Sequence, residues 1–158
     1  MKKLCLAAIT TLLLPNMSYA AACADGENAD GCTISTSDIT YTLTGNITPA
    51  SGVDGIEFTS GADGNDVTQT GNITTTGKSA YGLYLETSES NTTNLTGNIT
   101  TTGKSAYGLY IKDSDSNTTT ITGDIITSGT NKSEPILLEN SDSNTFTPSS
   151  TNLKVRIN

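Results

Sequence analysis

Apolar and polar residues alternate along short stretches of the chain, and this alternation is the first structural signal in the sequence. In "YGLYLE", at 81–86, Leu83 and Leu85 fall on one side of an extended chain while Tyr84 and Glu86 fall on the other. A second stretch, "NLTGNIT" at 94–100, places Leu95, Gly97 and Ile99 on one side in the same way. Because a period of two is that of a β-strand, these two stretches predict two clear short strands, one in each. A third, weaker strand is expected through "SNTT".

The alternating stretches recur at a fixed interval. The fifteen letters "TGNITTTGKSAYGLY" run from Thr70 to Tyr84 and again from Thr96 to Tyr110, an offset of 26 residues (96 − 70). Looser copies begin at Thr44 and Thr122, so four 26-residue repeats occupy 44–147. A period of this length is typical of solenoid proteins, in which each repeat packs against its neighbours.

The composition of the repeats selects the kind of solenoid. They are rich in Thr, Asn and Gly, which are poor helix formers, and they lack the dense leucine frame of leucine-rich repeats. The sequence therefore predicts an all-β fold, a parallel β-helix (β-solenoid) of about four 26-residue coils. Partial coils are expected on either side, at "ITYTLTG" and at "TNLKVRIN".

Equivalent positions of the repeats predict vertical columns in the stack. Two inward columns are expected: one holds Ile47, Ile73, Ile99 and Ile125, and the other holds the pairs Ile56 with Phe58, Leu83 with Leu85, Leu109 with Ile111, and Ile136 with Leu138. Glycines followed by Asn or Asp are expected at the corners, since both tolerate left-handed backbone; they are Gly45, Gly71, Gly97 and Gly123. A ladder of amide hydrogen bonds is expected along Asn65, Asn91, Asn117 and Asn144.

The N-terminal residues have the pattern of an export signal. Lys2 and Lys3 precede an apolar run at 4–14 that is too short to cross a bilayer, and Ser18-Tyr19-Ala20 resembles a cleavage site. We therefore expect a Sec signal peptide at 1–20, which sends the chain to the periplasm, the cell surface or the extracellular space. We expect residues 21–43 to form a disulfide loop with a capping strand. Residues 148–158 are expected to form a C-terminal strand or the start of a truncated coil.

The two cysteines that follow the predicted signal peptide, Cys23 and Cys32, are expected to form a disulfide in an oxidising compartment. An alternative is lipidation of Cys23 after cleavage beside Ala22.

The charge of the chain excludes one class of partner. Its net charge is −8, and it has no cluster of Lys and Arg of the kind that neutralises phosphates, so nucleic acid is not an expected partner. No second apolar run follows the signal peptide, so we expect no transmembrane segment in the mature chain.

The signal peptide, the cysteine-bounded loop and coils such as "SAYGLYLETSESNTTNLTGNITTTG" together resemble the passenger region of bacterial autotransporters, which use the type V secretion pathway. The resemblance covers nearly all of the chain from Cys23 to Asn158. It implies a right-handed β-helix displayed on or released from the cell surface, commonly as an adhesin or virulence factor. Autotransporters end in an outer-membrane β-barrel, and the 158 residues have no room for one, so the resemblance implies a short or truncated passenger with a separate barrel as partner.

Candidate chemistry is sparse. The chain has no His, so catalytic Ser-His and Cys-His arrangements are absent, and no catalytic residue and no cofactor are expected. Carboxylates recur at equivalent positions of the repeats and are weak candidates for a Ca²⁺ site or, less favoured, for a polysaccharide-cleaving site; otherwise they form a solvated turn. They are Asp63, Glu89, Asp115 and Asp142.

Two further sets of side chains are candidates for ligand contact. Tyr84 and Tyr110 should project outward one above the other, where they could stack on a sugar ring or simply form a ladder between coils. A T-x-T row could bind ice or carbohydrate through regularly spaced hydroxyls, but it lasts only two coils; it consists of Thr74, Thr76, Thr100 and Thr102.

The sequence thus predicts an exported, non-enzymatic surface protein that acts as an adhesion or interaction module, or survives as a remnant of one. Its partner would be a host-surface or carbohydrate ligand. Ice or carbohydrate binding by the Thr rows is the alternative, and a Ca²⁺-dependent polysaccharide-active enzyme is a more distant one.

Overall fold

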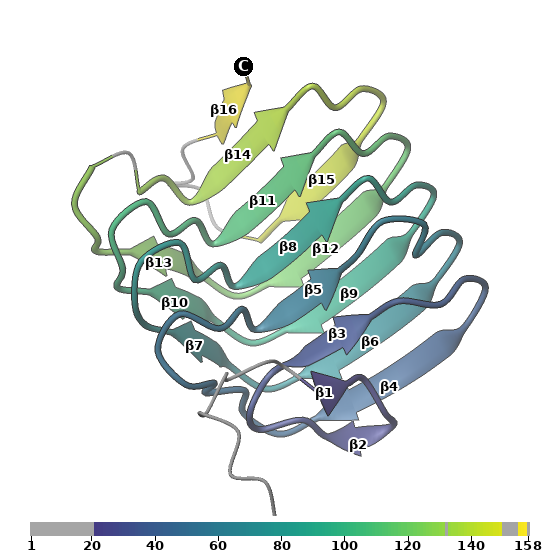
Figure 1. Cartoon of the computed structure of the whole chain (residues 1–158), viewed down its shortest axis with the longest axis horizontal. Helices are drawn as coiled ribbons and strands as arrows, with labels where there is room; N and C mark the ends of the chain where they lie inside the picture. Colours follow the sequence, from purple (N-terminus) through teal and green to yellow (C-terminus); the bar gives the residue numbers. More distant parts are fainter. Residues whose placement is uncertain (1–20, 132, 150–154, 158) are drawn as a thin grey trace, which may run out of the picture.

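The computed structural model describes residues 21–131, 133–149 and 155–157, and within these residues the regular secondary structure is all β. The predicted signal peptide at 1–20 lies outside the described residues. Successive strands of the chain run around a common axis and then stack on the strands of the previous turn, in a right-handed coil (Figure 1). The predicted parallel β-solenoid of about four turns is confirmed.

Three parallel sheets form the sides of the solenoid. Sheet A, in the foreground of Figure 1, contains β1 (Ala21–Ala22), β3 (Cys32–Ile34), β5 (Ile56–Phe58), β8 (Leu83–Glu86), β11 (Leu109–Lys112), β14 (Ile136–Glu139) and β16 (Val155–Ile157). Sheet B contains β2 (Gly26–Glu27), β4 (Thr40–Thr44), β6 (Asp66–Thr70), β9 (Thr92–Thr96), β12 (Thr118–Thr122) and β15 (Thr145–Pro148). Sheet C contains β7 (Ile73–Thr75), β10 (Ile99–Thr101) and β13 (Ile125–Thr127).

The register of the strands follows the sequence repeat. Ile73, Ile99 and Ile125 are directly paired across sheet C, 26 residues apart. In sheet A two steps are one residue longer, because Ile56 pairs with Leu83 (83 − 56 = 27) and Leu109 pairs with Ile136 (136 − 109 = 27). In the second of these steps the extra residue is absorbed between β13 and β14. Because side chains alternate between the two sides of a strand, this insertion must lie in a connection to leave the inward columns aligned.

The predicted inward columns form the core. Ile47, Ile73 and Ile99 are fully buried, as are Ile56, Phe58, Leu83, Leu85 and Leu109. Leu138 at the C-terminal end is only partly buried. The interior is therefore a stack of aliphatic layers, with each coil covering the apolar residues of the next.

The division of each coil into strands differs from the prediction at one place. The "SNTT" and "NLT" segments form a single strand, β9, and a corner at Gly97 separates it from β10. Gly97 has φ +140, and a Cβ there would collide with the carbonyl group of Gly71 in the coil below. Leu95 and Ile99 both point inward, but they do so from two different sheets.

The predicted asparagine ladder lies just before sheet B. The backbone N–H of Asn65 donates to Oδ1 of Asn91 at 2.8 Å, and the N–H of Asn91 donates to Oδ1 of Asn117 at 2.9 Å. The N–H of Asn117 donates in turn to Oδ1 of Asn144 at 2.8 Å. Asn65, Asn91 and Asn117 are each 1% exposed, so the ladder satisfies backbone groups that the turn would otherwise bury unpaired.

The N-terminal region is more regular than the expected loop with one strand. Residues 21–44 contribute four strands, of which β3 and β4 form a turn beneath the first repeat, while β1 and β2 pair with the lower edges of sheets A and B.

Candidate functional site

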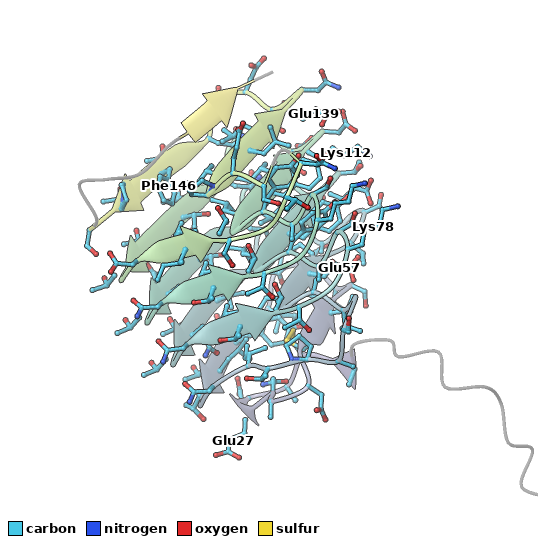
Figure 2. All side chains as sticks on the ribbon, turned by 90° about the vertical axis from the view of Figure 1, so that its left-hand side faces the viewer. Glu27, Glu57, Lys78, Lys112, Glu139 and Phe146 are labelled. Atoms are coloured by element: carbon cyan, nitrogen blue, oxygen red, sulfur yellow. A yellow bond between two sulfur atoms is a disulfide. The ribbon has the colours of Figure 1, made fainter. Side chains whose placement is uncertain are left out.

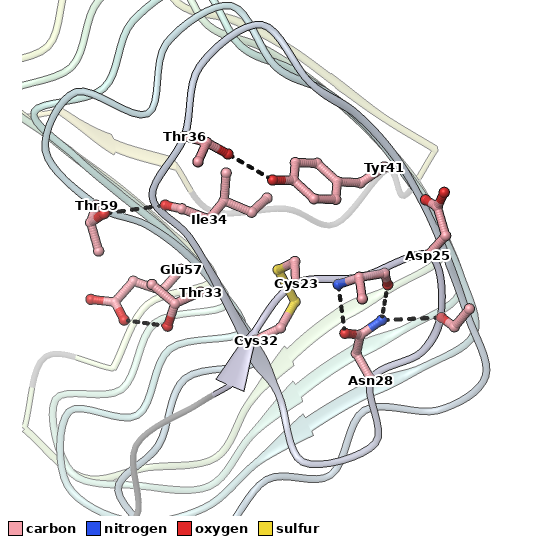
Figure 3. The surroundings of a disulfide bond; sticks show 12 residues. Cys23, Asp25, Asn28, Cys32, Thr33, Ile34, Thr36, Tyr41, Glu57 and Thr59 are labelled. Atoms are coloured by element: carbon pink, nitrogen blue, oxygen red, sulfur yellow. Dashed lines mark hydrogen bonds between the residues drawn. A yellow bond between two sulfur atoms is a disulfide. The ribbon is translucent and has the colours of Figure 1, made fainter.

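The disulfide between Cys23 and Cys32 closes the N-terminal end of the solenoid (Figure 3). Their Cα atoms are 4.7 Å apart, and the backbone N–H of Cys23 donates to the carbonyl oxygen of Thr33 at 3.0 Å. Inside the loop, the Asn28 side chain donates from Nδ2 to the carbonyl oxygen of Ala24 at 2.8 Å and accepts from the Ala24 N–H at 3.3 Å. The bridge joins the residue that follows β1 to the fully buried first residue of β3, so its role is to hold these two strands together.

The acidic column lies on a turn between sheets A and B, where its carboxylates bond to the backbone of the neighbouring coil. Oδ1 of Asp63 accepts from the N–H of Glu89, and Oδ1 of Asp115 accepts from the N–H of Asp142, both at 2.7 Å. Nowhere in the described part of the chain do three or more His, Cys, Asp or Glu residues gather in a way that could hold a metal ion. The contacts of this column are those of a turn ladder.

The predicted Thr rows lie on sheet C and at its end. Thr74 pairs with Thr100, and both are half-buried, while Thr76 and Thr102 are exposed beyond the strands. In the next coil the position of Thr100 is taken by Ile126, which is 48% exposed. This row therefore ends after two coils, as the sequence indicates.

Tyr84 and Tyr110 are directly paired on the outer side of sheet A. Their rings are stacked, with centroids 5.1 Å apart and an angle of 19° between the planes. Tyr84 is half-buried, whereas Tyr110 is only 9% exposed. The predicted ladder pair is present, but Tyr110 offers little surface to a ligand.

Two further tyrosines, which the sequence reasoning missed, complete an aromatic cluster. Tyr81 and Tyr107 form a second stacked pair with ring centroids 5.7 Å apart. The ring centroid of Tyr81 also lies 5.0 Å from those of Tyr84 and Tyr110. The repeated "YGLY" was the available signal, because it places a tyrosine on each side of the same glycine-leucine step. We call these four residues the tyrosine platform.

The glycine inside each "YGLY" lies at a position where the interior leaves no room for a side chain. A Cβ on Gly82 would collide with Cγ2 of Ile99, and a Cβ on Gly108 would collide with Cγ2 of Ile125. The isoleucines of sheet C thus fill the space beneath these glycines.

Charged side chains border the tyrosine platform. Tyr110 donates its hydroxyl proton to Oε2 of Glu139 at 2.9 Å, and Lys112 forms an ion pair with Glu86 at 2.6 Å. Glu57 on β5 is paired directly with Tyr84 on the neighbouring strand β8. In Figure 2, Glu57, Lys78, Lys112 and Glu139 lie on one side of the solenoid, and Phe146 of sheet B lies on the opposite side. The side chains that contact or pair with the platform and its neighbours thus include three carboxylates, Glu57, Glu86 and Glu139, and one lysine, Lys112.

These surroundings keep the platform neutral. Burial raises the pKa of Tyr81, Tyr84 and Tyr110 above its usual range, and in Tyr84 the neighbouring Glu86 raises it further. The contact with Glu86 raises the pKa of Lys112. At neutral pH the tyrosines are thus hydrogen-bonding phenols and Lys112 is a cation.

Asp54 lies at the lower edge of the platform. Its Oδ1 accepts from the N–H of Tyr81 at 2.6 Å. Burial raises the pKa of Asp54 to about 7; the hydrogen bond from Tyr81 lowers it, and the nearby Glu57 raises it. This carboxyl group therefore changes its charge close to neutral pH.

The chemistry of the platform suits binding. Aromatic rings offer flat apolar surface, while phenol and carboxylate oxygens accept hydrogen bonds. Comparison of the chain with protein-family models, curated proteins and solved structures finds no match. Within the described residues, no helix has the length and apolar character needed to span a membrane.

Proposed function

We propose that this chain is an exported, non-enzymatic adhesion module of the autotransporter-passenger kind, and that it binds saccharides at the tyrosine platform. The observation that carries the proposal is the group of four tyrosines on a rigid sheet, with stacked ring pairs and carboxylates at the border. A sugar ring presents an apolar face that packs on an aromatic ring, and hydroxyls at its edge that donate to carboxylates. The resemblance to autotransporter passengers supports export and display on the cell surface.

The charge at the platform selects among saccharides. With the chain at −8 and Glu57, Glu86 and Glu139 beside the tyrosines, an acidic sugar would be repelled. A neutral or amino sugar is the expected ligand. Tyr81, Tyr84 and Tyr107 carry the contact, because each is half-buried whereas Tyr110 is almost fully covered.

The test is binding of the full chain, expressed in a Gram-negative host and recovered from the periplasm, to an array of neutral, amino and acidic glycans. We expect binding to neutral or amino glycans, and affinity roughly fivefold weaker for Tyr84→Ser, since an aromatic contact contributes about 1 kcal/mol. Tyr41→Phe is the matched control, because Tyr41 is packed against the core on sheet B.

Several outcomes would contradict the proposal. Absence of binding to every glycan, or equal affinity of Tyr84→Ser and the parent chain, would remove the platform as the binding site. Accumulation of the chain in the cytoplasm would argue against export. A polysaccharide-cleaving activity that disappears in Asp115→Asn would make the acidic column catalytic and the protein an enzyme.

A further inference from the structure

The outer side of sheet B carries a regular array of threonines. Five paired strands, β4, β6, β9, β12 and β15, align their outward residues in three columns with four threonines in each. The columns are Thr40, Asp66, Thr92, Thr118 and Thr145; Thr42, Thr68, Asn94, Thr120 and Thr147; and Thr44, Thr70, Thr96 and Thr122. We call this array the threonine face.

The threonine face has a fixed spacing in two directions. Paired strands lie about 4.8 Å apart, and alternate residues along one strand lie roughly 6.6 Å apart. Threonine is branched at Cβ, so few rotamers are open to it and its methyl and hydroxyl groups keep defined positions. The strands stack in parallel along the solenoid (Figure 1), which extends the spacing over five coils.

The hydroxyls of the face are available to a partner. Thr92, Thr118 and Thr120 are half-buried and the other nine threonines are exposed. Within the described part of the chain, none of the twelve hydroxyls makes a hydrogen bond. Each can therefore both donate to and accept from a ligand.

The charge of the face points to a neutral partner. Among its fourteen positions the only ionisable residue is Asp66, at one edge, although the whole chain carries −8. A protein partner is not favoured, because protein interfaces are centred on aromatic or Arg anchors and this face has neither. What the array matches is a flat, uncharged partner that itself repeats at intervals of a few ångströms.

We infer that the threonine face binds ice. The oxygen atoms of an ice surface form a neutral lattice, in which every site both donates and accepts hydrogen bonds, with a repeat of the same order as the spacing between coils. Aligned hydroxyls can take lattice positions, while the methyl groups between them occupy the gaps. This activity is separate from saccharide binding, because the tyrosine platform belongs to sheet A and the threonine face to sheet B.

The test measures thermal hysteresis and inhibition of ice recrystallisation with the purified full chain. We expect both activities in the parent chain and their loss in Thr96→Lys, which places a long cation on the face between Thr70 and Thr122. Thr96→Val keeps the branched shape and removes one hydroxyl, and it should retain part of the activity. The matched control is Thr76→Lys, an exposed threonine beyond sheet C, which should retain all of it. Circular dichroism verifies that each variant keeps its β structure.

Two results would overturn the inference. One is a parent chain without thermal hysteresis, including a chain that adsorbs to crystalline cellulose or chitin but not to ice, since that would assign the face to a polysaccharide. The other is equal activity of Thr96→Lys and Thr76→Lys. Tyr84→Ser should keep full ice activity. Failure of the ice-binding inference can therefore be distinguished from failure of the saccharide-binding proposal.

Discussion

Sheets A and B are built from the same coils with the same parallel pairing, yet their inner sides differ. The inner columns of sheet A are entirely apolar in the repeats, with residues such as Phe58, Leu83 and Leu109 fully buried. The inner columns of sheet B include Gln69, Thr93 and Thr119, all at most 1% exposed. Oε1 of Gln69 and the hydroxyls of Thr93 and Thr119 have no hydrogen-bond partner among the described residues.

The outer sides of the two sheets differ in the contacts that their side chains make with one another. On sheet A the outward side chains contact one another, as in the stacked pair of Tyr84 and Tyr110 and the ion pair of Lys112 with Glu86. On sheet B the hydroxyls of the outward threonines make no hydrogen bonds among the described residues. The contrast teaches that sheet A combines an apolar interior with an outer side whose residues contact one another, while sheet B keeps a regular surface over a less well satisfied interior.

Truncation of a core side chain in sheet A has the largest expected effect. Leu109 is fully buried and paired with Leu83 and Ile136. Leu109→Ala should lower the free energy of unfolding by about 3 kcal/mol, because it removes buried apolar surface and leaves a cavity that rigid neighbouring coils cannot fill. Urea denaturation followed by circular dichroism measures the change.

An exposed position provides the control for this variant. Thr102→Ala, beyond the end of sheet C, should change the free energy of unfolding by less than about 0.5 kcal/mol. If Leu109→Ala cost no more than Thr102→Ala, the inner side of sheet A would not be the main source of stability.

The fold could be predicted from the sequence because its determinants are periodic. The 26-residue offset and the aliphatic columns define the coil, and each inward Ile or Leu has an equivalent in the next repeat. The candidate sites were harder to predict. Tyr81 was missed because it lies before the strand, outside the alternation that reveals Tyr84.

The threonine face was hidden for a related reason. In "NTTNLTG" threonine occurs on both sides of the strand, with Thr93 inside and Thr92 and Thr96 outside, so alternation in polarity does not reveal the outer row. Splitting this segment into two strands also separated Thr92 from Thr96. Thr92 and Thr96 lie on one side because β9 runs unbroken between them, and the chain turns only afterwards, at Gly97.

The dependence of stability on pH gives a second, smaller test of sheet A. The pKa of Asp54 is raised to about 7 in the folded chain from its ordinary 3.8, so between these values the folded state binds a proton that the unfolded state has lost. The contribution of Asp54 to the free energy of unfolding is thus fully present below about pH 4, and it is lost as the pH rises through 7. Asp54→Asn keeps an oxygen for the Tyr81 N–H and should be more stable than the parent chain at pH 8, by on the order of 1 kcal/mol.

The other carboxylates also titrate, so the informative quantity is the difference between variant and parent at each pH. That difference should grow between pH 5 and pH 8. Asp124→Asn is the control, because Asp124 is exposed at a corner where the other repeats have Asn. Equal pH profiles for Asp54→Asn and Asp124→Asn would argue that Asp54 is not desolvated at the edge of the tyrosine platform.

The smallest expected effect is a gain of stability inside sheet B. Thr119 is 1% exposed, its hydroxyl has no hydrogen-bond partner among the described residues, and Val67 holds the same column two coils below. Thr119→Val keeps the branched shape and removes the cost of burying an unpaired hydroxyl, so the free energy of unfolding should rise by about 1 kcal/mol in urea denaturation. The reverse change, Val67→Thr, should lower it by a similar amount. A loss of stability in Thr119→Val would mean that the hydroxyl is hydrogen-bonded in solution, and the interior of sheet B would then be as well satisfied as that of sheet A.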